Sequence, residues 1–270
     1  MAKLKEYNGH YCESEYEYAF IGFLEAEGWK YTLGNNISRK SYKDVLISED
    51  FLEFIKKTNS DLTDEEVSNI FDNVRLVGGE SDFAALHKVY GWMVDGVQFI
   101  PSSGIPRMVA LIDFNNPDNN IFRVVNQFVV EYTNNGKTVN RRPDVLLFVN
   151  GMPLCVIELK NPADAHATVY DAWEQINIRY WRDIPHLLHF CPLACISDGV
   201  KTRLGTVRTP YEHFYAWRRV NDGDEVSTLP FAETETMIKG VYAPERFLEI
   251  FRDYIYLILG ENTPPSIRRG

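Results

Sequence analysis

The hydrophobic pattern of this chain changes near its middle, from helical spacing to the alternation that is typical of strands. Over residues 13–27, apolar side chains recur every three or four positions, and Gly28 is expected to end that helix. Thr63 and Glu66 have the spacing of a capping box, which predicts a helix start inside a mostly helical segment, residues 35–104. The first part of the chain therefore predicts mainly helices.

The second part of the chain predicts a sheet, because short apolar runs alternate with turn residues. Strands are expected at 109–114, 122–132, a run that leads into Pro143, 145–149, 152–159 and 194–199, with a helix at 167–182, shorter strands near 202–208 and 213–219, and a last helix from Pro244. The order predicts an α/β fold, with a central mixed sheet that contains an antiparallel meander and is flanked by helices. It divides the chain into a first core helix with its lead-in (1–34), a mostly helical insertion (35–104), the α/β core (105–220), and a loop, helix and linker (221–270).

Composition limits the class of protein. The chain has 270 residues, 45% hydrophobic and 13% aromatic, which is enough for a large buried core. It has no apolar run of the ~18–20 residues that a membrane span requires and no apolar signal segment at its start. Its four cysteines are few for this length, so we expect a cytoplasmic protein without membrane contact.

The charge is unevenly distributed. A net charge of −10 argues against one basic surface over the whole chain. Residues 120–220 nevertheless carry more Lys and Arg than Asp and Glu, whereas residues 1–70 are acidic. A surface that faces phosphate is therefore expected in the middle of the chain, with Arg141, Arg142, Arg179 and Arg203 as candidate DNA-binding residues.

Three charged residues stand at the ends of two apolar strands. Asp144 precedes the first strand, an Asn-Gly turn joins the two, and Glu158 and Lys160 close the second. Side chains alternate along a strand, so Glu158 and Lys160 share one face of the sheet. Acids and a lysine that converge there can bind a hard divalent cation and position a water, which favours phosphodiester hydrolysis.

The register of this hairpin decides whether the charges meet. A strict two-residue turn would pair Asp144 with Ile157 and leave Glu158 on the opposite face. One additional residue pairs Asp144 with Glu158. We therefore predict a three-residue connection or a bulge at Asn150–Met152, with Gly151 in a left-handed conformation.

Two adjacent carboxylates repel each other unless a cation lies between them. Mg²⁺ fits this requirement, with Asp144, Glu158 and the backbone oxygen of Leu159 as candidate ligands. Lys160 is expected to hold the attacking water or stabilise phosphate charge, and Glu17 of the first helix is a candidate further acid. The alternative is a cross-strand salt bridge between Lys160 and an acid, without chemistry.

The combination of Pro-Asp, an apolar hairpin and Glu-x-Lys resembles the PD-(D/E)xK nuclease superfamily. Together with neighbouring motifs it is similar to the N-terminal nuclease domain of type I restriction enzyme R (HsdR) subunits, over roughly residues 13–34 and 105–255. The motifs are Val125–Phe128, Arg142–Val145, Val149–Leu154, Val156–Lys160, Gln175–Ile176, Asp183–Pro185, Ile196–Gly199, Thr202–Arg203 and Glu212–Trp217.

This resemblance implies a restriction-endonuclease-like core and a magnesium-dependent endonuclease that cuts double-stranded DNA within a complex with methyltransferase (M) and specificity (S) subunits. Asp144, Glu158 and Lys160 fall on the catalytic motif, and Glu17 falls on the family's helical acid. The family also has a Gln-x-x-x-Tyr signature. Gln175 matches its first residue, but Tyr180 follows five positions later rather than four.

ATP would enter only through a motor domain, because this chain has no Gly-x-x-x-x-Gly-Lys-(Ser/Thr) loop. A nuclease-like fold that serves only as a DNA-binding or docking module is the main alternative. A zinc site is a weaker one, since its candidate ligands have irregular spacing. His166 is expected to be a loop residue rather than a phosphate ligand. The candidate zinc ligands are His186, His189, Cys191 and Cys195.

Overall fold

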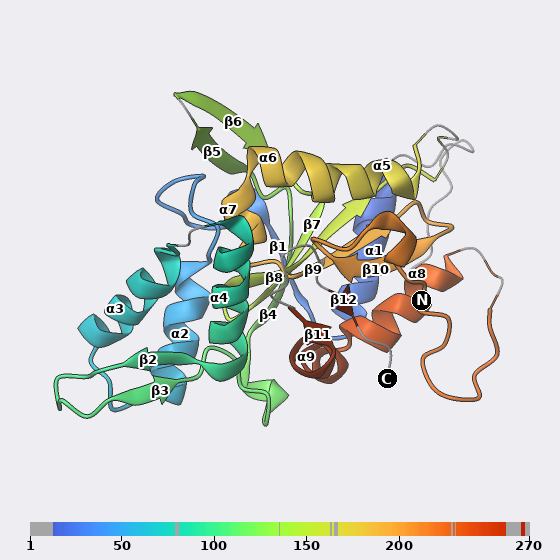
Figure 1. The fold of residues 1–270 in the computed structure, drawn as a ribbon. Helices are drawn as coiled ribbons and strands as arrows, with labels where there is room; N and C mark the ends of the chain where they lie inside the picture. The colour runs from blue at the N-terminus through green and yellow to red at the C-terminus, as the bar shows by residue number, and fades with distance from the viewer. Residues whose placement is uncertain are drawn as a thin grey trace.

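The computed structural model describes residues 13–78, 81–134, 136–162, 164, 167–227, 229, 231–257 and 266–267. Its centre is a mixed sheet of six strands in the order β1-β4-β7-β8-β9-β10 (Figure 1). β1 is parallel to β4 and β8 is parallel to β9, while the other neighbours are antiparallel. These strands are β1 (Lys30–Leu33), β4 (Phe122–Asn126), β7 (Val145–Val149), β8 (Met152–Leu159), β9 (Leu193–Ser197) and β10 (Thr202–Thr206).

Helices cover the sheet, and α5 and α6 cross it on the side opposite α9 (Figure 1). The α-helices are α1 (Glu13–Ala26), α2 (Ser48–Thr58), α3 (Asp64–Arg75), α4 (Asp82–Asp95), α5 (Val169–Glu174), α6 (Trp181–Asp183), α7 (Pro185–Leu188), α8 (Ala232–Met237) and α9 (Pro244–Asp253). Two π-helical turns, η3 (Gln175–Tyr180) and η5 (Ile238–Tyr242), and three 3₁₀ turns, η1 (Gly34–Asn36), η2 (Pro117–Asn119) and η4 (Tyr211–His213), complete the described helices. None of the described helices is long and apolar enough to cross a bilayer.

Strands β7 and β8 form the middle of the core. Every residue of both strands is buried, because helices pack on both faces of the sheet. A strand that is buried on both faces needs apolar side chains in both directions, which explains the continuous apolar runs on either side of the Asn-Gly turn. The fold is thus α/β with a central mixed sheet flanked by helices, as the sequence predicts, and the structure shows that this sheet has six strands.

Helix α1 and the capping box at Thr63 are confirmed. The expected strand 109–114 is wrong, because only β3 (Arg107–Val109) forms there, paired with β2 (Val97–Phe99). The expected strand at 213–219 is also wrong, since one isolated bridge joins Leu204 to Tyr215. A short pair, β11 (Ile255–Tyr256) with β12 (Ser266–Ile267), lies near the end of the chain.

The predicted single strand 122–132 is broken. Gln127 has a positive φ of 56°, which interrupts the ladder after β4. The chain then continues as β5 (Val130–Asn134), which pairs with β6 (Lys137–Arg141) in a separate two-stranded ribbon. This ribbon stands beyond the end of the central sheet and leads directly into Asp144 (Figure 1).

Candidate active site

The β7–β8 hairpin brings Asp144 opposite Glu158, by a route that differs from the predicted one. The connection is a tight two-residue turn, with Asn150 at φ 50° and Gly151 at φ 76°, so the left-handed Gly151 is confirmed and the three-residue connection is wrong. The additional residue lies inside β8, because Phe148 pairs with Pro153 while Leu147 pairs with Cys155. This bulge shifts the register by one.

Packing explains why the turn cannot accommodate the additional residue. A side chain on Gly151 would approach the backbone oxygen of Ile47 to 2.2 Å, so the start of α2 sits directly on the turn. Asn150 donates through Nδ2 to the Leu111 carbonyl at 2.9 Å and to Asn120 at 2.8 Å. The turn is therefore fixed on both sides. The bulge at Leu154 makes Val145 pair with Ile157, and one position further Asp144 comes opposite Glu158.

The two carboxylates lie close together at this end of the hairpin. One Asp144 oxygen accepts the backbone N–H of Leu159 at 2.7 Å. Glu158 is completely buried. Burial raises the pKa of Glu158 well above its usual range, and the nearby negative charge of Asp144 raises it further. The negative charge of the two carboxylates is therefore not fully compensated at this site.

Gln175 connects the charged groups. Lys160 Nζ donates to Gln175 Oε1 at 2.9 Å, and Gln175 Nε2 donates to Glu158 Oε2 at 2.5 Å. Among the residues that the structure describes, Lys160 forms no ion pair with an acid, so the structure does not show the cross-strand salt bridge that was the alternative. The ammonium group is instead held beside the two carboxylates by a neutral amide.

Tyr180 is a site residue that the sequence left uncertain. Its hydroxyl donates to Glu158 Oε1 at 2.5 Å and accepts from Gln175 Nε2 at 3.0 Å. Five residues advance an α-helix by about 1.4 turns, which would separate the two side chains. Residues 175–180 form the π-helical turn η3, whose wider turn aligns positions five apart. This π-helical turn accommodates the one residue by which the Gln175–Tyr180 spacing exceeds the Gln-x-x-x-Tyr signature.

Glu17 is buried, and its hydrogen-bond partners are Asn126 and Gln127. Asn126 Nδ2 donates to it at 2.6 Å and Gln127 Nε2 at 3.3 Å. Within the described part of the chain, no group of three or more His, Cys, Asp and Glu side chains could hold a metal. The structure therefore does not bring Glu17 into a three-acid cluster with Asp144 and Glu158.

The same result makes the zinc hypothesis wrong. His186 stacks on Tyr132, with ring centroids 5.2 Å apart, and His189 bonds to Asp82 at 2.9 Å. Cys191 and Cys195 are buried free thiols. His166 lies outside the described residues.

The four candidate DNA-binding arginines separate into two kinds. Arg141 pairs with Asp183 at 2.5 Å, and Arg203 pairs with Glu233 at 2.5 Å. Arg142 and Arg179 are exposed. Neither makes an ion pair within the described part of the chain. Only the second kind has a guanidinium that remains available to a phosphate.

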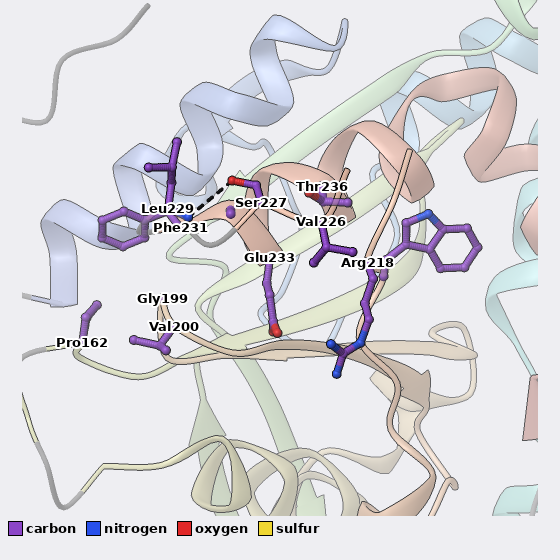
Figure 2. Close-up of a pocket in the computed structure, with 12 residues that line it drawn as sticks. Pro162, Gly199, Val200, Arg218, Val226, Ser227, Leu229, Phe231, Glu233 and Thr236 are labelled. Atoms are coloured by element: carbon purple, nitrogen blue, oxygen red, sulfur yellow. Dashed lines mark hydrogen bonds between the residues drawn. The ribbon is translucent and has the colours of Figure 1, made fainter. Parts of the chain in front are cut away.

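A pocket of about 500 Å³ lies beside the site rather than at it. Figure 2 shows Pro162, Gly199 and Val200 on one side of this pocket and Arg218 on the other. Its acid, Glu233, already accepts from Arg203 and from the backbone N–H of Thr202 at 3.0 Å. The pocket therefore offers no free carboxylate pair and does not compete with the hairpin as a cation site.

Comparison with known proteins adds an independent finding. The sequence model of the family described as type I restriction enzyme R protein N terminus matches residues 11–213. That range includes the whole of the hairpin and the η3 turn.

Two curated relatives are similar over most of this chain. The type I restriction enzyme HindI endonuclease subunit of Haemophilus influenzae is 30% identical over 258 residues, which cover 90% of this chain and 24% of the relative. A Methanocaldococcus jannaschii protein, named as the MjaIXP endonuclease subunit of a type I restriction enzyme, is 30% identical over 264 residues, covering 88% of this chain and 25% of the relative. The chain thus spans about a quarter of the length of these relatives.

Proposed function

This chain belongs to the family of type I restriction enzyme R protein N termini, and from that premise we propose that it is a metal-dependent DNA endonuclease domain. One observation carries the proposal: the bulged hairpin sets Asp144 against the buried Glu158, with Lys160 held beside them through Gln175. We infer that the six-stranded sheet is a nuclease-like core. Both relatives are named as endonuclease subunits, which supports the same activity.

The donor set fits Mg²⁺. Two carboxylates and backbone oxygens are hard ligands, and Mg²⁺ commonly uses one or two carboxylates and completes its shell with water and substrate phosphate. The buried Glu158 carboxylate, with a second acid beside it and a raised pKa, favours a cation as its neutralising partner. When bound, the cation supplies Lewis-acid stabilisation of phosphate charge and lowers the pKa of a coordinated water.

The protein groups would then divide the remaining tasks. Asp144 and Glu158, with the backbone oxygen of Leu159, would hold the cation. Lys160 would orient the attacking water or stabilise charge on the phosphate. Gln175 fixes the Lys160 ammonium, and Tyr180 fixes one oxygen of Glu158, so the two residues set the spacing of the charges.

Double-stranded DNA is the proposed substrate, and methyltransferase and specificity subunits are the proposed partners. ATP would act through the part of the longer relatives that this chain does not cover. These assignments rest on family membership.

The test replaces Asp144 by Asn within a complete type I restriction complex that contains this chain. We expect DNA cutting to be lost while ATP hydrolysis and translocation remain, because the substitution removes a cation ligand without a change of volume. Asp118→Asn, an exposed acid on η2, is the control. Normal cutting by the Asp144→Asn complex would sink the proposal, and a fold-only docking module is the conclusion in that case.

A further inference from the structure

We propose that the β5–β6 ribbon is a DNA-contacting arm that lies along the duplex and aligns the phosphodiester with the candidate active site. This inference rests on the proposed function, because it concerns how DNA reaches the same site. Its starting point is connectivity: β6 ends at Arg141, and the chain reaches Asp144 three residues later. Any contact on β6 is therefore coupled to Asp144 by a few residues of backbone.

One face of the ribbon is anchored to the body of the protein. Tyr132 stacks on His186 of α7 at 5.2 Å, and Arg141 binds Asp183 of α6 at 2.5 Å. The backbone N–H of Glu131 also donates to the Tyr42 carbonyl at 2.8 Å. These contacts fix the base and the direction of the ribbon. It projects from the molecule near α6 (Figure 1).

The other face is polar and exposed. Thr133 pairs across the ribbon with Thr138, and Glu131 pairs with Asn140, which places these four side chains on the face opposite Tyr132 and Arg141. Thr133, Thr138 and Asn140 are exposed. These exposed hydroxyl and amide groups do not contribute to packing of the core. It matches the short polar side chains that bind DNA phosphates and base edges.

The exposed face of the ribbon ends close to the site along the chain. Thr138 and Asn140 share that face on β6, the strand ends at Arg141, and Arg142 lies in the short segment that carries the chain to Asp144, where the backbone bends. Arg142 is exposed and has no ion-pair partner within the described part of the chain, unlike its neighbour Arg141. Lys137, also exposed, begins β6 at the tip of the ribbon, on the same face as Val139 and Arg141.

The dimensions suit a duplex. The five residues of β6, Lys137–Arg141, span about 13 Å, comparable to about four base pairs. The major groove of B-DNA admits a two-stranded ribbon. The exposed cations Lys137 and Arg142 outnumber the one acid of the ribbon, Glu131. This local positive charge occurs in a chain whose net charge is −10, so the ribbon is where phosphate contact is electrostatically favoured.

Fluorescence anisotropy with a labelled 24-base-pair duplex, in EDTA and over a range of salt concentrations, tests this without any cleavage. In the double variant Lys137→Gln/Arg142→Gln, we expect roughly 10-fold weaker binding and a log–log salt slope that is smaller by about 2, one for each lost phosphate contact. The matched control, Lys30→Gln/Lys57→Gln, removes the same charge, and Lys30 lies at the opposite end of the sheet. It should leave the slope unchanged. Both variants should keep the melting temperature of the unmodified chain.

An equal loss of duplex affinity in the two double variants would show that only the net charge of the protein affects binding, and would overturn the proposal. No change in the ribbon variant, or no duplex binding by the unmodified chain at low salt, would overturn it as well. The outcome is independent of the cleavage test. A ribbon variant that binds normally, combined with an Asp144→Asn complex that does not cut, would reject the arm and keep the nuclease.

Discussion

Two buried carboxylates in different regions of this protein differ in how their negative charge is compensated. Asp50, at the junction between α2 and the sheet, is 1% exposed and receives two hydrogen bonds from the guanidinium of Arg123, at 2.5 and 2.6 Å. Glu158, at the end of β8, is 0% exposed and is held by two neutral donors, Gln175 and Tyr180, with a second acid beside it.

The difference separates structure from chemistry. A buried charge is costly unless a partner compensates it. At Asp50 the compensation is complete within the protein, so nothing remains to be bound. At Glu158 it is incomplete, and a cation from outside can supply the rest. Perturbed carboxylates of the second kind are the ones that gather at functional sites.

Replacing the carboxylate of Glu158 by an amide should give the largest effect on activity. Glu158→Gln keeps the shape and one accepting oxygen, replaces the other oxygen by an N–H donor, and removes the charge that holds the cation. We expect cleavage by the assembled complex to fall more than about 100-fold, since even groups behind the metal ligands contribute about 10–100-fold. The melting temperature should stay the same or rise, because an uncompensated charge has been removed. Glu212→Gln, on exposed η4, is the control, and a strongly destabilised Glu158→Gln protein would contradict the comparison.

At Asp50, replacement of the carboxylate by an amide should lower the stability of the fold instead. Asp50→Asn leaves Arg123 buried without a counter-charge, and breaking such a pair costs about 3–5 kcal/mol. Urea unfolding followed by circular dichroism measures this loss. The double change Asp50→Asn/Arg123→Met should recover part of it. A single variant as stable as the unmodified chain would show that Arg123 does not compensate Asp50.

His186 represents a third way to bury an ionisable group, which is to keep it neutral. Burial lowers the pKa of His186 to about 4, below its ordinary value. The unfolded chain therefore binds the proton more readily, so this stabilisation is complete above pH ~6.5 and is lost as pH falls towards about 4, by at most ~3 kcal/mol. The difference in unfolding free energy between the unmodified chain and His186→Phe should change over that window. A constant difference would contradict the lowered pKa.

Tyr180→Phe should give the smallest effect, because it removes one hydrogen bond to Glu158 and leaves the ligands in place. We expect about 10–100-fold slower cleavage by the assembled complex, as for other groups that orient a metal ligand. Magnesium should activate the variant only at higher concentration, which a purely structural role would not produce. Tyr170→Phe, on the adjacent helix α5 and 44% exposed, is the matched control. Equal magnesium dependence in both variants would exclude an orienting role for Tyr180.

Alternation along a strand is local, and for that reason the sequence could place Glu158 and Lys160 on one face. It also predicted the left-handed Gly151. The partners of Glu17 could not be predicted in the same way. They depend on the break at Gln127, where an apparently continuous strand leaves the central sheet and becomes the ribbon.

The sequence by itself determined the α/β class, the apolar hairpin and the residues at its open end, because hydrophobic period and turn chemistry act over a few neighbours. Only the tertiary structure decided how those residues meet. The start of α2 and the Leu111 carbonyl hold the Asn150–Gly151 turn at two residues. The additional residue is therefore the bulge at Leu154, and this bulge sets the register of the hairpin. The π-helical turn likewise aligned Gln175 with Tyr180 against Glu158. Both outcomes depend on packing between segments far apart in the chain, which no local pattern records.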